Sequence, residues 1–390
     1  MYGFPSAIKY LISFTVLCLL IYYRIIAPFK SDPGNIFRGI LTFFVIWSII
    51  LLGAVIINPQ SELWPTLSFP QRVFGQPNFL LPYVFPIFLL YSKFSIDFFI
   101  NLIKYASIFI FIAVLVEIYT LFSGVSIADK EQQSRVLLFD LGSSFLLLIS
   151  HLARKKYIFH TALLYMLLRI ILLAQWGRRA MFLDAMLVMA AMIIARLRTV
   201  YLTFNDRMKI YFSGFILAFL FLSVSQIVSS TYIFQRGFTK EAQEETRGFV
   251  YEAFFRDLDT APEYIFGRGI GGTIVRDVDT GRIVDFVESG FLILLFKGGL
   301  LYLIPFLIIL IRAFFLGFFK SKNYITKALA ILILIYIISM YGWNWPDLSA
   351  RYLFLWVSVS GCYNSDLRSI SNEDIYQLIN TERGKSLRST

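Results

Sequence analysis

Long apolar runs separated by short polar segments dominate the chain. Clear examples are residues 40–57, 210–228 and 291–311. Each run is close to the roughly 18 to 20 residues that an α-helix needs to cross the hydrocarbon core of a bilayer. The pattern therefore predicts an all-α, polytopic membrane protein.

About eleven such spans (10 to 12) are predicted. The first run, residues 10–26, contains Arg24 and has no small-x-small cleavage site, so it is expected to be a retained helix and not a signal peptide. The predicted span centres lie near residues 18, 47, 85, 110, 144, 166, 188, 219, 302, 333 and 357.

Basic residues predict the orientation of these spans, because loops rich in Lys and Arg stay in the cytoplasm. Segments that hold Lys93, residues 154–156, or Lys320 with Lys322 alternate with less basic segments. The expected external connections are 58–78, 123–135, 176–179, 230–287 and 342–349. The predicted organisation is eight transmembrane helices in 1–229, a long external loop in 230–287, three more helices in 288–363, and a cytoplasmic polar tail in 364–390.

Composition agrees with a membrane location. The chain is 58% hydrophobic and 16% charged, whereas soluble domains are about a quarter charged. The net charge of +11 is explained by cytoplasmic loops, so no nucleic-acid partner is predicted. Cys18 and Cys362 lie at opposite ends, and His151 and His160 form a weak metal signature. Neither a metal site nor a cofactor is expected.

The stretch FGRGIGG, residues 266–272, contains the G-x-G-x-x-G spacing at Gly267, Gly269 and Gly272. A dinucleotide site needs a buried strand before this pattern and a helix after it. No strong apolar strand precedes it, and TIVRDVDTGRIVDF, which follows, predicts a hairpin turning at residues 279–281. These glycines are instead expected to allow a tight turn or a close approach of the backbone.

Two ionisable residues lie inside predicted spans. Arg169 and Asp184 are each a few residues from the outer ends of neighbouring antiparallel spans, which places them at similar depth. Charges inside a bilayer are costly, and they pair or line a polar cavity. Two interpretations follow: an ion pair, or the floor of a polar site.

Arginines also occur on the side where few are expected. The external turn QWGRR ends in Arg178 and Arg179, and planar guanidinium groups there suit a lipid pyrophosphate or ordinary lipid phosphates. The long external loop adds Arg247, Arg256 and Arg268. Its residues 240–258 predict an amphipathic surface helix, so many loop charges can be a solvated face.

Glu288 lies where the loop re-enters the membrane. It is either a charge stabilised by the helix dipole, or a carboxylate that acts as a general base or orients a sugar hydroxyl.

The order of these features resembles the Wzy-type O-antigen polymerase and ligase superfamily. The resemblance rests on TRGFVYEAFFRDLDTAPEYIFGRGIGG followed by VESGFLILLFKGGLLYL, and covers about residues 165 to 315. It implies a GT-C-like, metal-independent glycosyltransferase of the bacterial cytoplasmic (inner) membrane. Such an enzyme transfers a glycan from undecaprenyl diphosphate to a sugar hydroxyl on the outer face.

The resemblance also implies roles for individual residues. Arg178 or Arg179 takes the place of the family arginine at the head of an inner helix, Arg247 that of the loop arginine, and Arg268 lies in the glycine motif. Arg256 and Gly267 satisfy an R-x10-G spacing described for polymerase loops. Ligases carry a His-Asn or similar pair where this chain has Glu288 and Ser289, so a polymerase is favoured.

The resulting hypothesis is that the arginines hold the lipid diphosphate while Glu288 activates the acceptor hydroxyl. The product is O-antigen, capsule or exopolysaccharide. The expected partners are the undecaprenyl-diphosphate-linked glycan, membrane lipid, a chain-length regulator and a flippase. The alternatives are an O-antigen ligase, or a transporter or flippase of lipid-linked glycans with Arg169, Asp184 and Asp140 along its path.

Overall fold

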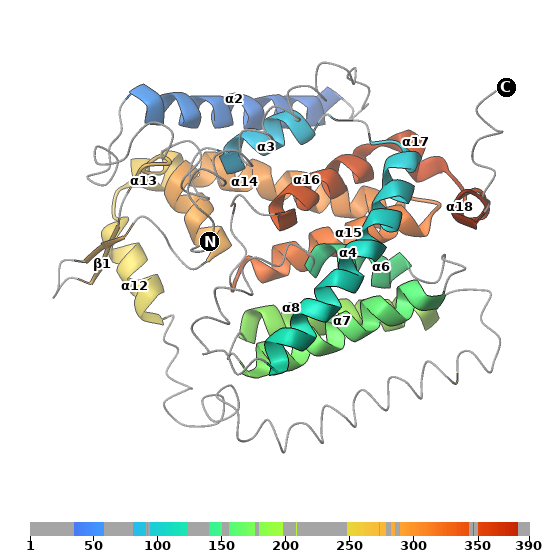
Figure 1. The fold of residues 1–390 in the computed structure, drawn as a ribbon. Helices are drawn as coiled ribbons and strands as arrows, with labels where there is room; N and C mark the ends of the chain where they lie inside the picture. The colour runs from blue at the N-terminus through green and yellow to red at the C-terminus, as the bar shows by residue number, and fades with distance from the viewer. Residues whose placement is uncertain are drawn as a thin grey trace.

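The computed structural model is helical apart from one small hairpin (Figure 1). It describes residues 35–57, 81–90, 92, 94–122, 140–149, 156–175, 179–197, 208, 248–272, 274–277, 282–284, 289–342, 346 and 350–380. The helices within these ranges are α2 (Asn35–Ile57), α3 (Leu81–Leu89), α4 (Ile96–Phe122), α6 (Asp140–Ile149), α7 (Lys156–Gln175), α8 (Arg179–Leu197), α12 (Gly248–Asp257), α13 (Ala261–Phe266), α14 (Gly290–Phe319), α15 (Tyr324–Ser339), α16 (Ala350–Tyr363), α17 (Ser365–Ser369) and α18 (Asn372–Asn380). The strands β1 (Ile274–Asp277) and β2 (Arg282–Val284) pair antiparallel. The prediction of a mainly helical fold is confirmed for these residues.

The helices pack in two groups. Helix α14 lies in the first group and contacts α2, α13, α15 and α16, while α4, α6, α7 and α8 contact one another in the second. Helix α15 joins the groups because it packs on α6 and α8 as well as on α14 and α16. In Figure 1, α2 lies at one edge of this arrangement and α7 and α8 at the other.

One end of the bundle is tied together by buried asparagines. Asn323 caps α15 by accepting from the Thr326 amide at 2.9 Å, and its Nδ2 donates to the Leu367 carbonyl at 2.7 Å. Asn364 caps α17, and its Nδ2 donates to the Phe94 carbonyl at 3.0 Å. The connections before α4, before α15 and after α16, all expected in the cytoplasm, therefore lie at the same end.

The opposite end gathers segments that are expected outside. The Gly290 amide at the start of α14 donates to the carbonyl of Met340, just past the end of α15, at 2.7 Å. Helices α12 and α13 and the hairpin lie at this end, away from α17 and α18 (Figure 1). The described part of the long loop thus packs on the first turns of α14.

Most predicted spans correspond to helices. Nine of the eleven predicted centres fall inside α2, α3, α4, α6, α7, α8, α14, α15 and α16, and the centres near 18 and 219 lie outside the described residues. Among the described helices, α14 alone is both long and apolar enough to cross a membrane, with a mean hydropathy of 2.4 over its best window. Helix α3 is short, and it contains Pro86, which cannot donate a helical hydrogen bond. The count of eleven spans remains a prediction.

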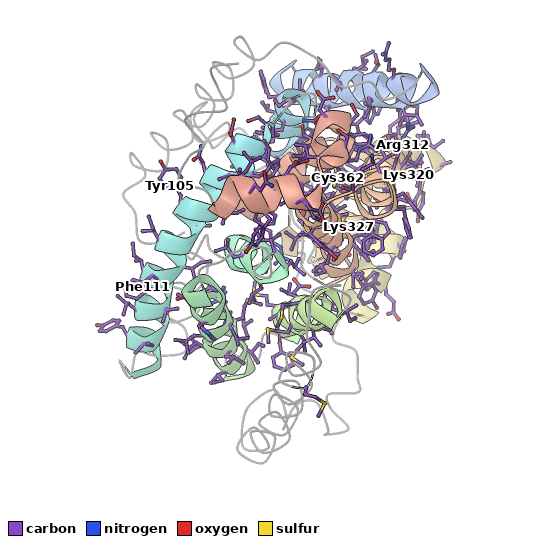
Figure 2. The ribbon with its side chains drawn as sticks, turned by 90° about the vertical axis from the view of Figure 1, so that its right-hand side faces the viewer. Tyr105, Phe111, Arg312, Lys320, Lys327 and Cys362 are labelled. Carbon is purple, nitrogen blue, oxygen red and sulfur yellow. The ribbon has the colours of Figure 1, made fainter. Side chains whose placement is uncertain are left out.

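Apolar side chains lie on outward faces as well as in the core, and a few charged side chains are buried. Apolar residues on outward faces of α2, α4 and α14 are exposed, and Tyr105 and Phe111 point away from α4 in Figure 2. Meanwhile Arg169, Asp184 and Lys297 are buried. Soluble proteins seldom bury charged residues, and they seldom expose large contiguous apolar faces. The exposed apolar residues on these three helices include Ile46, Ile49, Ile50, Ile108, Ile112, Leu115, Tyr119, Leu300, Ile304, Ile308, Ile311, Phe315 and Phe319.

Candidate functional site

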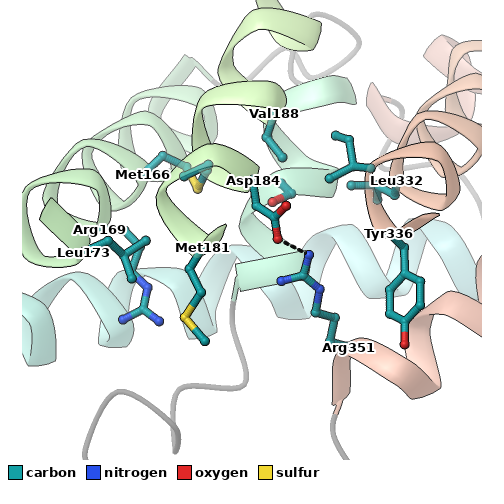
Figure 3. A pocket seen from close by; sticks show the side chains of 12 residues that line it. Met166, Arg169, Leu173, Met181, Asp184, Val188, Leu332, Tyr336 and Arg351 are labelled. Carbon is teal, nitrogen blue, oxygen red and sulfur yellow. Dashed lines mark hydrogen bonds and ion pairs between the residues drawn. The ribbon is translucent and has the colours of Figure 1, made fainter. Parts of the chain in front are cut away.

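A cavity lies where α6, α7 and α8 face α15 and α16 (Figure 3). Its volume of about 40 Å³ leaves room for a few water molecules. Most of its wall is apolar, but charged and hydroxyl groups come from five different helices. The lining residues are Ser144, Met166, Arg169, Leu173, Met181, Asp184, Ala185, Val188, Leu332, Ile335, Tyr336 and Arg351.

Asp184 is the centre of a buried polar network in this cavity. Its Oδ2 accepts from Nη2 of Arg351 at 2.6 Å, and its Oδ1 accepts from the hydroxyl of Ser339. The residue is only 6% exposed, and a buried carboxylate is tolerated when it is paired and hydrogen-bonded. The pair links α8 to α16 across the end of α15.

Arg169 lies on the same cavity wall, as its matched depth with Asp184 indicated. It comes from α7 and is 3% exposed. An ion pair in the cavity joins Asp184 to Arg351, a residue that the sequence analysis did not single out. A signal was present, because Arg351 is a basic residue at the expected outer end of the last span, where the positive-inside rule predicts few. Two arginines and one aspartate give the cavity wall an excess of positive charge.

The remaining residues predicted at this site lie next to it or outside the described part. Arg178, Arg247 and Glu288 are outside the described residues, and so is the predicted helix segment 240–247. Arg179 is the first residue of α8, five positions before Asp184, and only its backbone is described. Ser289, which follows Glu288, donates from its hydroxyl to the Met340 carbonyl at 3.4 Å. The start of α14 therefore lies beside the residue that follows Ser339.

Arg268 forms a clamp inside the external loop. Its Nε donates to Oε1 of Glu263 at 2.8 Å, its Nη1 to Oδ2 of Asp257 at 2.5 Å, and its Nη2 to the Asp257 carbonyl. These contacts join the end of α12 to α13 and to the glycine turn, so Arg268 braces the loop. Its role as a diphosphate ligand stays a prediction. Arg256, in the last turn of α12, is exposed.

The glycine motif makes backbone contact with a break in α14. Gly267 and Gly269 have φ angles of 74° and 78°, and Gly299 has φ 67° inside α14. A Cβ on Gly299 would lie 2.1 Å from the Ile265 carbonyl oxygen, and one on Gly267 would lie 2.6 Å from the Gly299 nitrogen. The glycines therefore allow two backbones to touch, as the close-approach interpretation predicted.

The break in α14 leaves helix carbonyls that need other donors, and neighbouring segments supply them. The Phe296 carbonyl accepts from the Arg268 amide at 2.8 Å, and the Gly298 carbonyl accepts from the Trp47 indole at 3.0 Å. The motif follows α13 and precedes β1, which is not the order of a strand and then a helix that a dinucleotide fingerprint requires. The predicted hairpin is confirmed as well.

The predicted surface helix is confirmed over residues 248–257, which form α12. Phe254 is fully buried and, with Leu258, packs against Leu292, Leu295 and Phe296 of α14. The side of α12 that carries Glu252 and Arg256 is exposed. The apolar face of α12 thus attaches the loop to α14.

Lys297 is a second functional candidate that the sequence analysis missed. It is 1% exposed, and its Nζ donates to the Gly272 carbonyl at 2.8 Å. Lys297 is the one charged residue in the apolar run 291–311, and that isolation was the available signal. A buried ammonium here connects α14 to the end of the glycine motif.

The clamp should respond to acid. The hydrogen bond from Arg268 lowers the pKa of Glu263, and this contribution to loop stability is present above the unfolded value of about 4.3 and lost as the pH falls through the folded pKa. We expect amide-exchange protection at residues 263–268, corrected for intrinsic rates, to be level from pH 7 to 5 and to fall below about pH 4. In Glu263→Gln the fall should be shallower. Equal pH profiles in the two proteins would refute this assignment.

Within the ranges that the structure describes, no three His, Cys, Asp or Glu side chains lie close enough to hold a metal ion. The groups brought together at this end are guanidinium, ammonium, carboxylate and hydroxyl groups, which can bind anions and move protons. No family model matches the chain, and comparisons with curated proteins and with solved structures found no match.

Proposed function

We propose that the chain is a multi-pass protein of the bacterial cytoplasmic membrane. The support is the distribution of side chains: α2, α4 and α14 expose apolar faces, whereas Arg169, Asp184 and Lys297 are buried. Lipid would cover the apolar faces, which in water would be a large exposed patch. The buried charges then belong to an interior polar site, because charges inside a membrane face the bundle interior or a cavity.

The proposed activity is the polymerisation of undecaprenyl-diphosphate-linked repeat units by a metal-independent glycosyltransferase. The observation that carries it is the cavity lined by Arg169, Asp184 and Arg351, whose Asp184–Arg351 pair lies beside the end of α15, where α14 begins. Permanently charged guanidinium groups suit a lipid diphosphate at the outer membrane face. A loop braced over the same end suits an enzyme that keeps water from an activated sugar.

The proposed step is a single displacement. The acceptor hydroxyl gives its proton to the Glu288 carboxylate while its oxygen attacks the anomeric carbon of the donor's first sugar. The bond from that carbon to the diphosphate oxygen breaks, and undecaprenyl diphosphate leaves with the electron pair. Arg178, Arg179 and Arg247, supported by Arg169, would stabilise the negative charge that develops on the leaving group.

A transporter or flippase is the second candidate, and one observation favours it. The cavity lies between two groups of helices that α15 joins, and an interface of this kind can rock open. Asp140, predicted along such a path, begins α6, but its side chain is outside the described part. A polymerase and a flippase differ in the lipid-linked intermediate that accumulates when the protein is lost.

The glycan ladder of a deletion strain tests the proposal. The wild-type gene should restore long chains, whereas Arg169→Met should leave a single repeat unit on the acceptor lipid at unchanged protein level. Lys320→Met, at the opposite end of the bundle, is the matched control and should restore the ladder. Long chains that stay on the carrier lipid would instead identify a ligase. Repeat units trapped on the cytoplasmic face would identify a flippase.

A further inference from the structure

Lys297 is buried where four loop contacts converge on one turn of α14. The Arg268 amide donates to the Phe296 carbonyl, the Lys297 ammonium donates to the Gly272 carbonyl, and Gly267 touches Gly299. Phe254 of α12 packs on the ring of Phe296 with centroids 6.2 Å apart. Residues 296–299 are therefore the part of α14 to which the loop attaches, and we call them the seat of the loop.

The contact made by Lys297 differs from the other three because it buries a charged group, which costs free energy. A charged ammonium is strongly hydrated in water, and its burial must be offset by specific partners. Here the partners are the Gly272 carbonyl at 2.8 Å and the face of the Phe296 ring, 4.9 Å from Nζ to the ring centroid. A leucine would fill most of the same space without that cost, so the side chain is best explained by the turn that it holds.

Its position also explains how the two ends of the motif are held. Arg268 braces the motif toward α12 through Asp257 and Glu263. Lys297 holds Gly272, the last glycine of the motif and four residues after Arg268, against α14. With both contacts made, residues 267–272 cannot move as a unit without breaking a charge-assisted hydrogen bond.

We infer that Lys297 is a positioning residue that seats residues 267–272 of the external loop on α14 and so keeps the loop in the arrangement that the proposed reaction requires. The inference rests on the proposed function for its catalytic consequence. Its structural part, the seating of residues 267–272, stands on the contacts alone. Lys297 itself acts through the loop backbone.

Hydrogen exchange on the purified, detergent-solubilised protein separates these two parts. Lys297→Met keeps the length and apolar stem but cannot donate, and it should raise exchange of the Arg268 and Gly272 amides by about tenfold or more. Lys297→Gln retains a neutral donor and should restore part of the protection. Lys320→Met is the matched control, and all variants should show wild-type protection in α15 and α16.

The same variants are then assayed for polymer. Lys297→Met should lower the rate of chain extension at saturating substrate at least tenfold, with partial rescue by Lys297→Gln. Unchanged exchange in Lys297→Met would overturn the seating role. Lost protection with a normal rate would overturn its link to catalysis. If the wild-type protein makes no polymer, the proposed function fails, and the exchange result alone decides the seating role.

Discussion

Replacing Arg351 with methionine is expected to lower the free energy of unfolding by about 3 to 5 kcal/mol, because the change leaves the Asp184 carboxylate buried without its charged partner. Asp184 is 6% exposed and accepts from Arg351 at 2.6 Å. The measurement is thermal unfolding of the detergent-purified protein, together with its yield from membranes.

A double variant separates a lost ion pair from general damage. Asp184→Leu with Arg351→Met removes both charges, and it should recover most of the lost stability, since apolar replacements of a buried pair are often neutral. Ser339 keeps a hydrogen-bond acceptor in the Ile335 carbonyl at 2.6 Å. If the double variant is as unstable as the sum of its single changes, the two residues are not coupled and this account of the pair is wrong.

Gly299→Ala is expected to destabilise the protein by about 2 to 5 kcal/mol, combining a positive φ angle with overpacking. The new methyl group would lie 2.1 Å from the Ile265 carbonyl oxygen and 2.6 Å from the Gly267 nitrogen. Both atoms belong to backbone, which cannot turn away as a side chain would. Helix α13 should therefore separate from α14, and thermal unfolding with proteolysis of the loop would detect the change.

The chain offers a matched control in α2. Gly39→Ala adds the same methyl group at a position with nothing within 4 Å and no positive φ angle. It should stabilise the protein by up to about 1 kcal/mol, because alanine favours a helix over glycine. Equal effects at the two positions would show that the contact between α13 and α14 is not as close as described.

Local pattern predicted the elements that depend on local chemistry. The apolar runs predicted the position of α14, and the turn residues 279–281 predicted the hairpin. The glycine motif was recognised as a close backbone approach, but its partner was not, because Gly299 lies 32 residues from Gly267 and breaks a helix that hydropathy shows as continuous. Hydropathy averages over a window and cannot report a single φ angle.

In the candidate site, too, some features follow from local sequence pattern and others depend on tertiary contacts. Arg169 and Asp184 lie at similar distances from the adjoining ends of two antiparallel helices, which predicted that they lie at similar depth. Both line the cavity. The partner Arg351 is 167 residues from Asp184 along the chain, and no periodicity relates them. The sequence did not predict the contacts of Arg268 with Asp257 and Glu263. Folding of the loop brings them together, and that contact is tertiary.

Reconstitution of the purified protein in liposomes tests the central claim most directly. Supplied with undecaprenyl-diphosphate-linked repeat units as sole substrate and no divalent cation, the wild-type protein should produce lipid-linked oligomers of increasing length and release undecaprenyl diphosphate. Arg169→Met should produce neither under the same conditions. If the wild-type protein leaves the repeat units unextended while moving them across the bilayer, the polymerase account is contradicted and the chain is a transporter.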